Sequence, residues 1–237
     1  MKLKYTRILV KISGEQLAGA DGSGINKKIA KRIAAEVAQA ISVGTEVVIM
    51  VGGGNFIRGA QIEGSGIKRV TGDFMGMLAT LINAIALNDI FAENSVPSRI
   101  LTSIVADQVA DQYTQRRALH QLTKGRVVIL GGGVARPYLT TDTAALNLAL
   151  ELDCDLVCKI TKVDGVYDRD PVRFADAKLI PELSFTKAVE DENIRVMDKA
   201  ALALALEYKM PIVVCDLDQH DNLKKVALGE KIGTLIS

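Results

Sequence analysis

The chain has no tryptophan, two histidines and three cysteines among its 237 residues. Two histidines, His120 and His220, are too few for a zinc site built on imidazole ligands. The cysteines, Cys154, Cys158 and Cys215, are odd in number and lack paired metal-ligand spacing. We therefore expect them to be buried free thiols in a reducing compartment, the cytoplasm.

An excess of charge of one sign is also missing. The sequence has 29 basic and 28 acidic side chains, a net charge of +1. This balance argues against a protein that binds nucleic acid through a broad basic surface. It leaves open an anionic small molecule, because recognition of such a ligand depends on local charge.

No long hydrophobic run is present. The first residues lack the apolar core of a signal peptide. The longest apolar stretch, around Met75 to Leu87, is interrupted by Asn83 and is too short to span a membrane. We expect it to form a buried helix, and we expect no membrane partner.

Familiar nucleotide signatures are absent as well. The chain contains no GxxxxGK[ST], no correctly spaced GxGxxG, and no His-Arg-Asp with Asp-Phe-Gly. A P-loop ATPase, an ordinary dinucleotide dehydrogenase and a protein kinase are therefore disfavoured.

What is present is an alternation of short apolar runs and helical patterns. The runs are rich in Val and Ile and mostly continuous, as in strands covered on both faces. Expected strands are 8–12, 46–51, 99–104, 126–130, 156–160 and 212–217, and expected helices are 27–43, 73–94, 114–123, 142–152 and 198–208. This order predicts an α/β fold with a largely parallel sheet. The length suits a single domain over 1–237, with a soft internal division near 152–160.

Three glycine-rich turns follow apolar runs: Lys11-Ile12-Ser13-Gly14, Gly52 to Gly59, and Gly131-Gly132-Gly133. Glycine allows close approach of backbone to a ligand, and successive N–H groups can bind an anion. Three such turns suggest a site for a polyphosphate and a second anion.

Basic side chains accompany the first two turns. Lys11 closes the first strand, where it is either a lysine extending along a strand edge or an ammonium poised over phosphoryl oxygens. Arg58 lies four residues beyond Gly54, and its planar guanidinium suits phosphate, although tandem glycines also mark simple turns. Asp73 stands at the start of a predicted helix, as an N-cap, a dipole partner or a ligand for a hydroxyl.

The later segments have plain alternatives too. Thr141 or Asp142 can cap the next helix, and a helix N-terminus can also bind an anion. Asp-Gly and Asp-Pro within 161–171 are ordinary turn formers. The Thr, Tyr and Asp residues of this stretch also suit a nucleoside base and ribose.

Taken together, these residues resemble the bacterial uridylate kinase family of the amino acid kinase superfamily, from about Arg7 to Ile236. The motifs that carry the resemblance are the following: Arg7 to Glu15, Gly52 to Gly59, Gly72 to Thr80, Thr140-Thr141-Asp142, Thr161 to Tyr167, Asp170-Pro171 and Val196-Met197-Asp198. Each motif alone is modest, and their common order and spacing are specific.

The resemblance implies a three-layer α/β/α sandwich with a mostly parallel central sheet, assembled as a homohexamer. It implies transfer of the ATP γ-phosphoryl group to UMP, with Mg²⁺ carried on the nucleotide phosphates rather than by protein ligands. By position, the ATP residues are Lys11, Ile12, Ser13, Gly14, Gly54, Arg58, Thr161, Tyr167 and Asp170. The UMP residues are Gly53, Asp73, Val134, Ala135, Arg136, Pro137, Tyr138, Leu139, Thr140 and Thr141. Lys11, Asp142 and Arg58 are the expected catalytic residues.

The chain departs from the family pattern in two places. Val134 and Arg136 replace a threonine and an asparagine that read the nucleotide, so strict pyrimidine selectivity is not implied. Arg99 and Arg126 match an inter-subunit GTP site of some relatives, but Ala92 and Gln115 replace its His and Trp. We therefore expect weak or absent activation by GTP.

Two other functions remain open at this stage. One is a kinase of the same superfamily that acts on a carboxylate or on carbamate, which Arg58 and Asp73 disfavour. The other is a non-catalytic nucleotide-binding or storage oligomer of the same fold. Retention of Lys11, Asp142 and Asp170 together favours catalysis over the second alternative.

Overall fold

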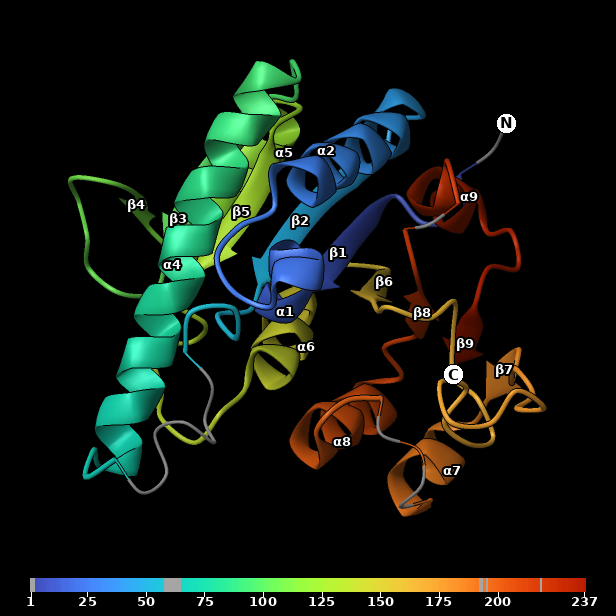
Figure 1. The fold of residues 1–237 in the computed structure, drawn as a ribbon. Helices are drawn as coiled ribbons and strands as arrows, with labels where there is room; N and C mark the ends of the chain where they lie inside the picture. Colours follow the sequence, from blue (N-terminus) through green and yellow to red (C-terminus); the bar gives the residue numbers. More distant parts are fainter. Residues whose placement is uncertain (1–2, 58–64, 192–193, 195, 218) are drawn as a thin grey trace.

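A computed structural model describes residues 3–57, 65–191, 194, 196–217 and 219–237. Their centre is one sheet of nine strands in the order β4-β3-β5-β2-β1-β6-β8-β9-β7 (Figure 1). Neighbouring strands are parallel except β8 and β9. The sheet thus continues through β1 and β6 without a break, and the predicted α/β class with a mostly parallel sheet is confirmed.

All six predicted strands form. The strands are β1 (Arg7–Ile12), β2 (Glu46–Val51), β3 (Ser98–Thr102), β4 (Asp111–Gln112), β5 (Val127–Gly131), β6 (Leu156–Ile160), β7 (Glu182–Leu183), β8 (Ile212–Cys215) and β9 (Thr234–Ile236). The predicted runs 99–104 and 212–217 extended two residues too far, to the apolar Ile104 and Leu217 beyond the last strand residue. Strands β4, β7 and β9 were missed because two or three residues carry no periodicity.

Helices cover both faces of the sheet. They are α1 (Gly14–Ala18), α2 (Lys27–Ser42), α4 (Arg69–Glu93), α5 (Gln115–Thr123), α6 (Thr141–Glu151), α7 (Phe185–Glu190), α8 (Lys199–Tyr208) and α9 (Asn222–Leu228), with a short 3₁₀ helix at Gly19–Asp21. Apolar residues of α1, α2, α4 and α9 pack in one core with one face of the strands. Those of α5, α6, α7 and α8 pack in a second core on the other face. The result is the three-layer α/β/α sandwich that the resemblance implied.

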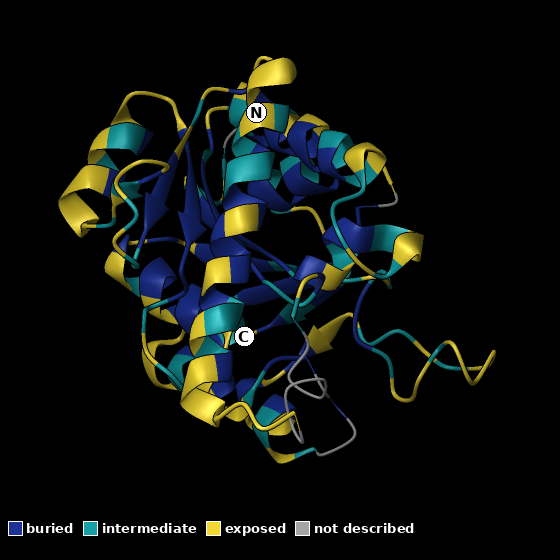
Figure 2. Ribbon diagram, turned by 60° about the vertical axis from the view of Figure 1, so that its left-hand side comes forward, coloured by how far each residue is buried: buried dark blue, intermediate teal, exposed yellow. Residues whose placement is uncertain are grey.

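The continuous apolar strands are explained by this double covering. Along β1, Ile8, Val10 and Ile12 face the first core and Leu9 faces the second. Strands buried on both faces lie between exposed helix surfaces (Figure 2). The three cysteines are buried and free, as expected.

Helix α4 is the longest helix of the described chain, and it differs from its prediction at its start. It begins at Arg69, so Asp73 lies one turn inside the helix and is not its N-cap. By length and composition α4 could cross a membrane. In the fold it packs against α2, β3 and β5, which is the buried-helix role expected of the apolar stretch.

Candidate active site

The first two glycine turns touch each other at the carboxyl ends of β1 and β2. Ser13 caps α1, and its hydroxyl accepts a hydrogen bond from the Gln16 amide while the Gln16 side chain accepts one from the Ser13 amide. A Cβ on Gly14 would lie 2.4 Å from Asn55 Oδ1 and 2.6 Å from the Gly54 nitrogen. Only glycine fits there, so this contact brings Ser13-Gly14 and Gly53-Gly54 side by side.

The second turn is held by helix α4. Asn83, fully buried, donates to the Gly52 carbonyl at 2.7 Å and to Asn55 Oδ1 at 2.7 Å. Asn55 donates back to Asn83 Oδ1 at 2.9 Å and to the Gly24 carbonyl at 2.7 Å. The polar residue that interrupts the apolar stretch, Asn83, therefore anchors the second glycine turn.

The third turn is held by the same helix. The Gly132 amide donates to Thr80 Oγ1 of α4 at 2.7 Å. Ser103, beyond β3, donates to the Gly133 carbonyl at 2.7 Å. Helix α4 thus positions both turns, and it does so through side chains spaced along one face.

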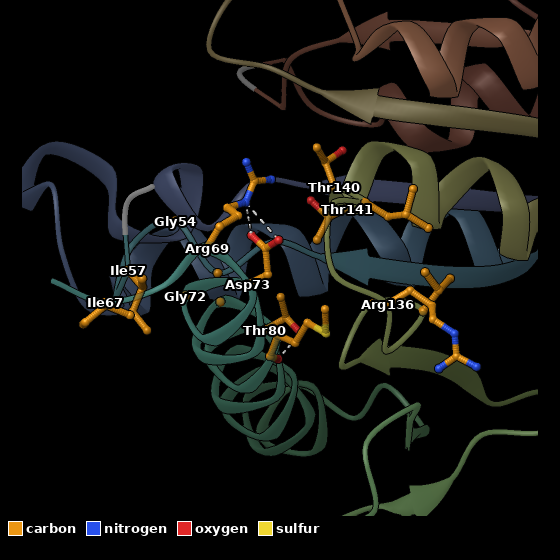
Figure 3. A pocket seen from close by; sticks show the side chains of 16 residues that line it. Gly54, Ile57, Ile67, Arg69, Gly72, Asp73, Thr80, Arg136, Thr140 and Thr141 are labelled. Carbon is orange, nitrogen blue, oxygen red and sulfur yellow. Dashed lines mark hydrogen bonds and ion pairs between the residues drawn. The ribbon is translucent and has the colours of Figure 1, made fainter. Parts of the chain in front are cut away.

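A cavity of about 670 Å³ opens between α4 and the second and third turns (Figure 3). Its lining is Gly53, Gly54, Ile57, Ile67, Arg69, Gly72, Asp73, Gly76, Met77, Thr80, Gly133, Val134, Arg136, Leu139, Thr140 and Thr141. Seven of the ten residues predicted to bind the acceptor are in this set. Ala135, Pro137 and Tyr138 belong to the same loop without lining the cavity.

Asp73 lies at the wall of this cavity in an ion pair with Arg69 that was not predicted. Arg69 Nε lies 2.8 and 2.9 Å from its two oxygens, and the Tyr138 amide donates to Oδ2 at 2.8 Å. The Arg69 guanidinium also lies over the Tyr138 ring, 5.2 Å from its centre. The Arg136 guanidinium points away from Asp73 and donates to the Ala135 carbonyl (Figure 3). Arg69 was missed, although its i,i+4 spacing from Asp73 is a readable signal.

Lys11 and Asp142 meet in a buried ion pair, with a second lysine beside them. Asp142, in the first turn of α6, has Oδ1 2.6 Å from Lys11 Nζ and Oδ2 2.8 Å from Lys159 Nζ. Burial alone would raise the pKa of Asp142, but the two ammonium groups outweigh it and hold the pKa below its ordinary value. Lys159 was missed, although a lysine within the buried run 156–160 indicates that a carboxylate must pair with it.

The start of α6 is tied to the start of α8. Thr140 caps α6 and donates from its hydroxyl to Asp198, and Thr143 donates to both Asp198 oxygens at 2.9 Å. Asp198 in turn caps α8 by accepting from the Ala201 amide at 2.9 Å. The carboxylate fixes two helix N-termini next to Asp142.

The residues predicted to bind the ATP nucleoside lie apart from the cavity. Thr161 follows β6, and its hydroxyl donates to the Val163 carbonyl at 2.5 Å. Tyr167 donates to Asp164 at 2.6 Å, a bond that raises the pKa of Tyr167. Asp170 accepts from the Val172 amide at 2.9 Å. Because β1 lies between β2 and β6, Lys11 at its end stands between this stretch and the cavity.

Arg58 lies outside the described residues. No group of three His, Cys, Asp or Glu side chains able to hold a metal ion occurs in the part of the chain that the structure describes. Mg²⁺ usually takes one or two carboxylates together with several phosphate or water oxygens. Both oxygens of Asp142 already lie within 2.8 Å of lysine ammonium groups.

Comparison with known proteins places this geometry in context. Residues 6–216 match the model of the amino acid kinase family. The structure is similar to UMP kinase from Bacillus anthracis, with a TM-score of 0.93, 39% identity and coverage of 98% of this chain and 96% of that one. It is similar to UMP kinase from Ureaplasma parvum, with a TM-score of 0.89, 31% identity and 99% coverage of both chains. Uridylate kinase from Archaeoglobus fulgidus gives 0.73 and 25% identity, covering 97% of this chain and 99% of that one.

Proposed function

The chain belongs to the amino acid kinase family, and we propose that it is a UMP kinase that transfers the γ-phosphoryl group of ATP to UMP, in pyrimidine nucleotide biosynthesis. The observation that carries this proposal is the match in fold and sequence to UMP kinases over nearly the whole chain. The local geometry agrees with it, because a cavity and a separate polar stretch lie on either side of Lys11. The cavity can hold the acceptor nucleotide and the polar stretch the donor, with Lys11 between them.

The acceptor occupies the cavity between α4 and the third turn. Asp73 presents a carboxylate at the cavity wall, where it suits ribose hydroxyls. Arg69 also lines the cavity, and its guanidinium can leave Asp73 to pair with a phosphate of the ligand. Val134 and Arg136 line the part of the cavity formed by the third turn. Val134 offers the base no side-chain hydrogen bond, so uracil selectivity depends on backbone groups and on shape.

ATP lies on the other side of Lys11. Its phosphates contact Lys11, Ile12, Ser13, Gly14, Gly54 and Arg58, and its nucleoside contacts Thr161, Tyr167 and Asp170. The packing of Gly14 on Gly54 supports this assignment, because it brings two glycine turns together at the carboxyl ends of β1 and β2, and successive N–H groups of such turns can bind an anion. Mg²⁺, when bound on the phosphates, supplies further neutralisation of their charge.

Phosphoryl transfer then needs little covalent help from the protein. An anionic oxygen of the UMP phosphate forms a bond to the γ-phosphorus, and the bond from that phosphorus to the β,γ-bridging oxygen breaks, releasing ADP. No proton moves in this step, so no general base is required. Lys11 stabilises the charge on the transferring group, and Asp142 keeps the Lys11 ammonium in place.

A coupled assay of ADP release with a panel of acceptors tests the proposal. UMP, CMP, other monophosphates, amino acids and carbamate are each supplied with ATP and Mg²⁺. ADP formed with UMP, and with no carboxylate or carbamate, is the expected result. Turnover of a carboxylate or carbamate alone would make the chain another kinase of the family. Nucleotide binding without turnover of any acceptor would make it a binding protein.

We also propose that the protein is a cytoplasmic homohexamer. Val70, Phe74, Leu78 and Ile82 repeat at i+4 along α4, and each is between 41% and 49% exposed. A stripe of large apolar side chains on one helix supports burial against another subunit. Light scattering should give a mass six times the 25.5 kDa of the chain, and a monomer mass at micromolar concentration would contradict the assembly.

A further inference from the structure

Two lysines stand side by side on adjacent strands. Lys11 of β1 is paired in register with Lys159 of β6, and the strands are parallel. Both side chains are therefore on the face of the sheet that α6 and α8 cover. Their side chains are 7% and 14% exposed, so neither ammonium is well solvated.

Two buried like charges at neighbouring positions repel each other, and burial adds to the cost. Burial and the nearby Lys11 charge lower the pKa of Lys159, while Asp142 acts against both. The carboxylate relieves the repulsion because each of its oxygens meets one ammonium, at 2.6 and 2.8 Å. Because Lys159 holds the other oxygen, the Asp142 carboxylate meets Lys11 in a fixed orientation.

Lys159 differs from Lys11 in how its donors are used. Besides Asp142, it donates to the Val196 carbonyl in the segment that leads into α8. The Asp198 carboxylate, which caps α8, also favours the charged form of Lys159. In the described chain, Asp142 is the one ion-pair partner of Lys11, which leaves donors of its ammonium for a ligand.

We propose that Lys159 is a positioning residue for phosphoryl transfer. It fixes the Asp142 carboxylate against α8 through Oδ2, so that Oδ1 holds the Lys11 ammonium at the place where charge develops. Lys159 itself touches neither nucleotide. The inference rests on the proposed function, since it assigns Lys11 to the transferring phosphoryl group.

Steady-state kinetics of Lys159→Met and Lys159→Arg test this role. Methionine keeps the length of the side chain and removes the charge, so kcat should fall by about 10- to 100-fold as Lys11 loses its fixed position. The KM values for ATP and UMP should change less than about threefold, because the binding contacts remain. Arginine should restore part of kcat, and the exposed Lys124→Met is the matched control with wild-type kinetics.

A pH titration separates positioning from a structural role. The charges that face Asp142 are Lys11 from β1 and Lys159 from β6, and the Asp198 carboxylate is held nearby by Thr140 and Thr143. Loss of the Lys159 charge should raise the pKa of Asp142, so the acid limb of the kcat profile moves to higher pH. A ¹³C NMR titration of the Asp142 carboxyl should show the same upward shift without requiring turnover.

The possible outcomes are distinct. Wild-type kcat in folded Lys159→Met, or a lower kcat with an unmoved Asp142 titration and no rescue by arginine, would overturn the positioning role. If the wild-type protein turns over no acceptor, the proposed function fails. The NMR titration then still decides whether Lys159 holds Asp142, and an unchanged carboxyl pKa overturns this inference by itself.

Discussion

Replacement of Asn83 by alanine probes how α4 holds the second glycine turn. The substitution removes the amide that donates to the Gly52 carbonyl and exchanges hydrogen bonds with Asn55. It leaves two acceptors without these donors, Gly52 O and Asn55 Oδ1, in a region where Asn83 is fully buried. Asn55 Nδ2 retains its bond to Gly24 O.

The magnitude follows from those two acceptors. Each buried group left unsatisfied costs about 1–3 kcal/mol, and alanine returns about 0.5 kcal/mol through its higher helix propensity. We expect Asn83→Ala to lower the free energy of unfolding by about 1.5–5.5 kcal/mol in total, since two such groups lose their donors. For a chain of this size a loss of 3 kcal/mol corresponds to a drop in Tm of roughly 6–12 °C.

Urea unfolding, followed by circular dichroism, measures the change. Asn147→Ala is the matched control, because Asn147 is an exposed residue within α6. We expect it to stay within about 0.5 kcal/mol of wild type. A double-mutant cycle with Asn55→Ala should give a coupling of at least about 0.5 kcal/mol for the amide pair. Asn83→Ala as stable as Asn147→Ala, with no coupling to Asn55, would refute the anchoring role.

Three further predictions concern the site. Lys11→Ala should keep the fold and lower kcat by about 10²- to 10³-fold, since one electrostatic donor is lost; near-wild-type turnover in the ADP-release assay would remove Lys11 from the mechanism. Gly53→Ala should raise the KM for UMP, because a Cβ there would lie 2.6 Å from the Gly76 carbonyl and push α4 from the turn; an unchanged KM for UMP would contradict this packing. GTP should change the initial rate little, because Ala92 replaces the histidine of the GTP site in some relatives, although it shares a surface pocket with Arg99 and Arg126. Several-fold stimulation by GTP would show that this expectation is wrong.

The long apolar strands and the glycine turns could be predicted from the sequence because both depend on local constraints. A run such as 46–51 has few ways to bury Val and Ile on both sides except within a covered sheet. Helix boundaries were less certain. The start of α4 was placed at Asp73 because that residue type is a common cap, whereas the chain already turns into the helix at Arg69.

The site was partly predictable for the same reason. Lys11, Gly53, Asp73 and Asp142 stand next to recognisable turns or helix starts, so their neighbourhood could be inferred from position in the chain. Lys159 was read only as part of a strand, because its pairing with Asp142 depends on contacts between segments. Arg69 was not considered, although its partner Asp73 lies one turn further along the same helix.

By itself, the sequence determined the alternation of strands and helices, the three glycine turns and the family to which they belong. Spacing along the chain carries that information, because backbone geometry and side-chain periodicity act over a few residues. Tertiary structure alone decided that Asn83 anchors the second glycine turn and that Lys159 shares Asp142 with Lys11. Such pairings join residues far apart in sequence, and their energies exist only once the sheet has set the register between strands and the helices have closed over it.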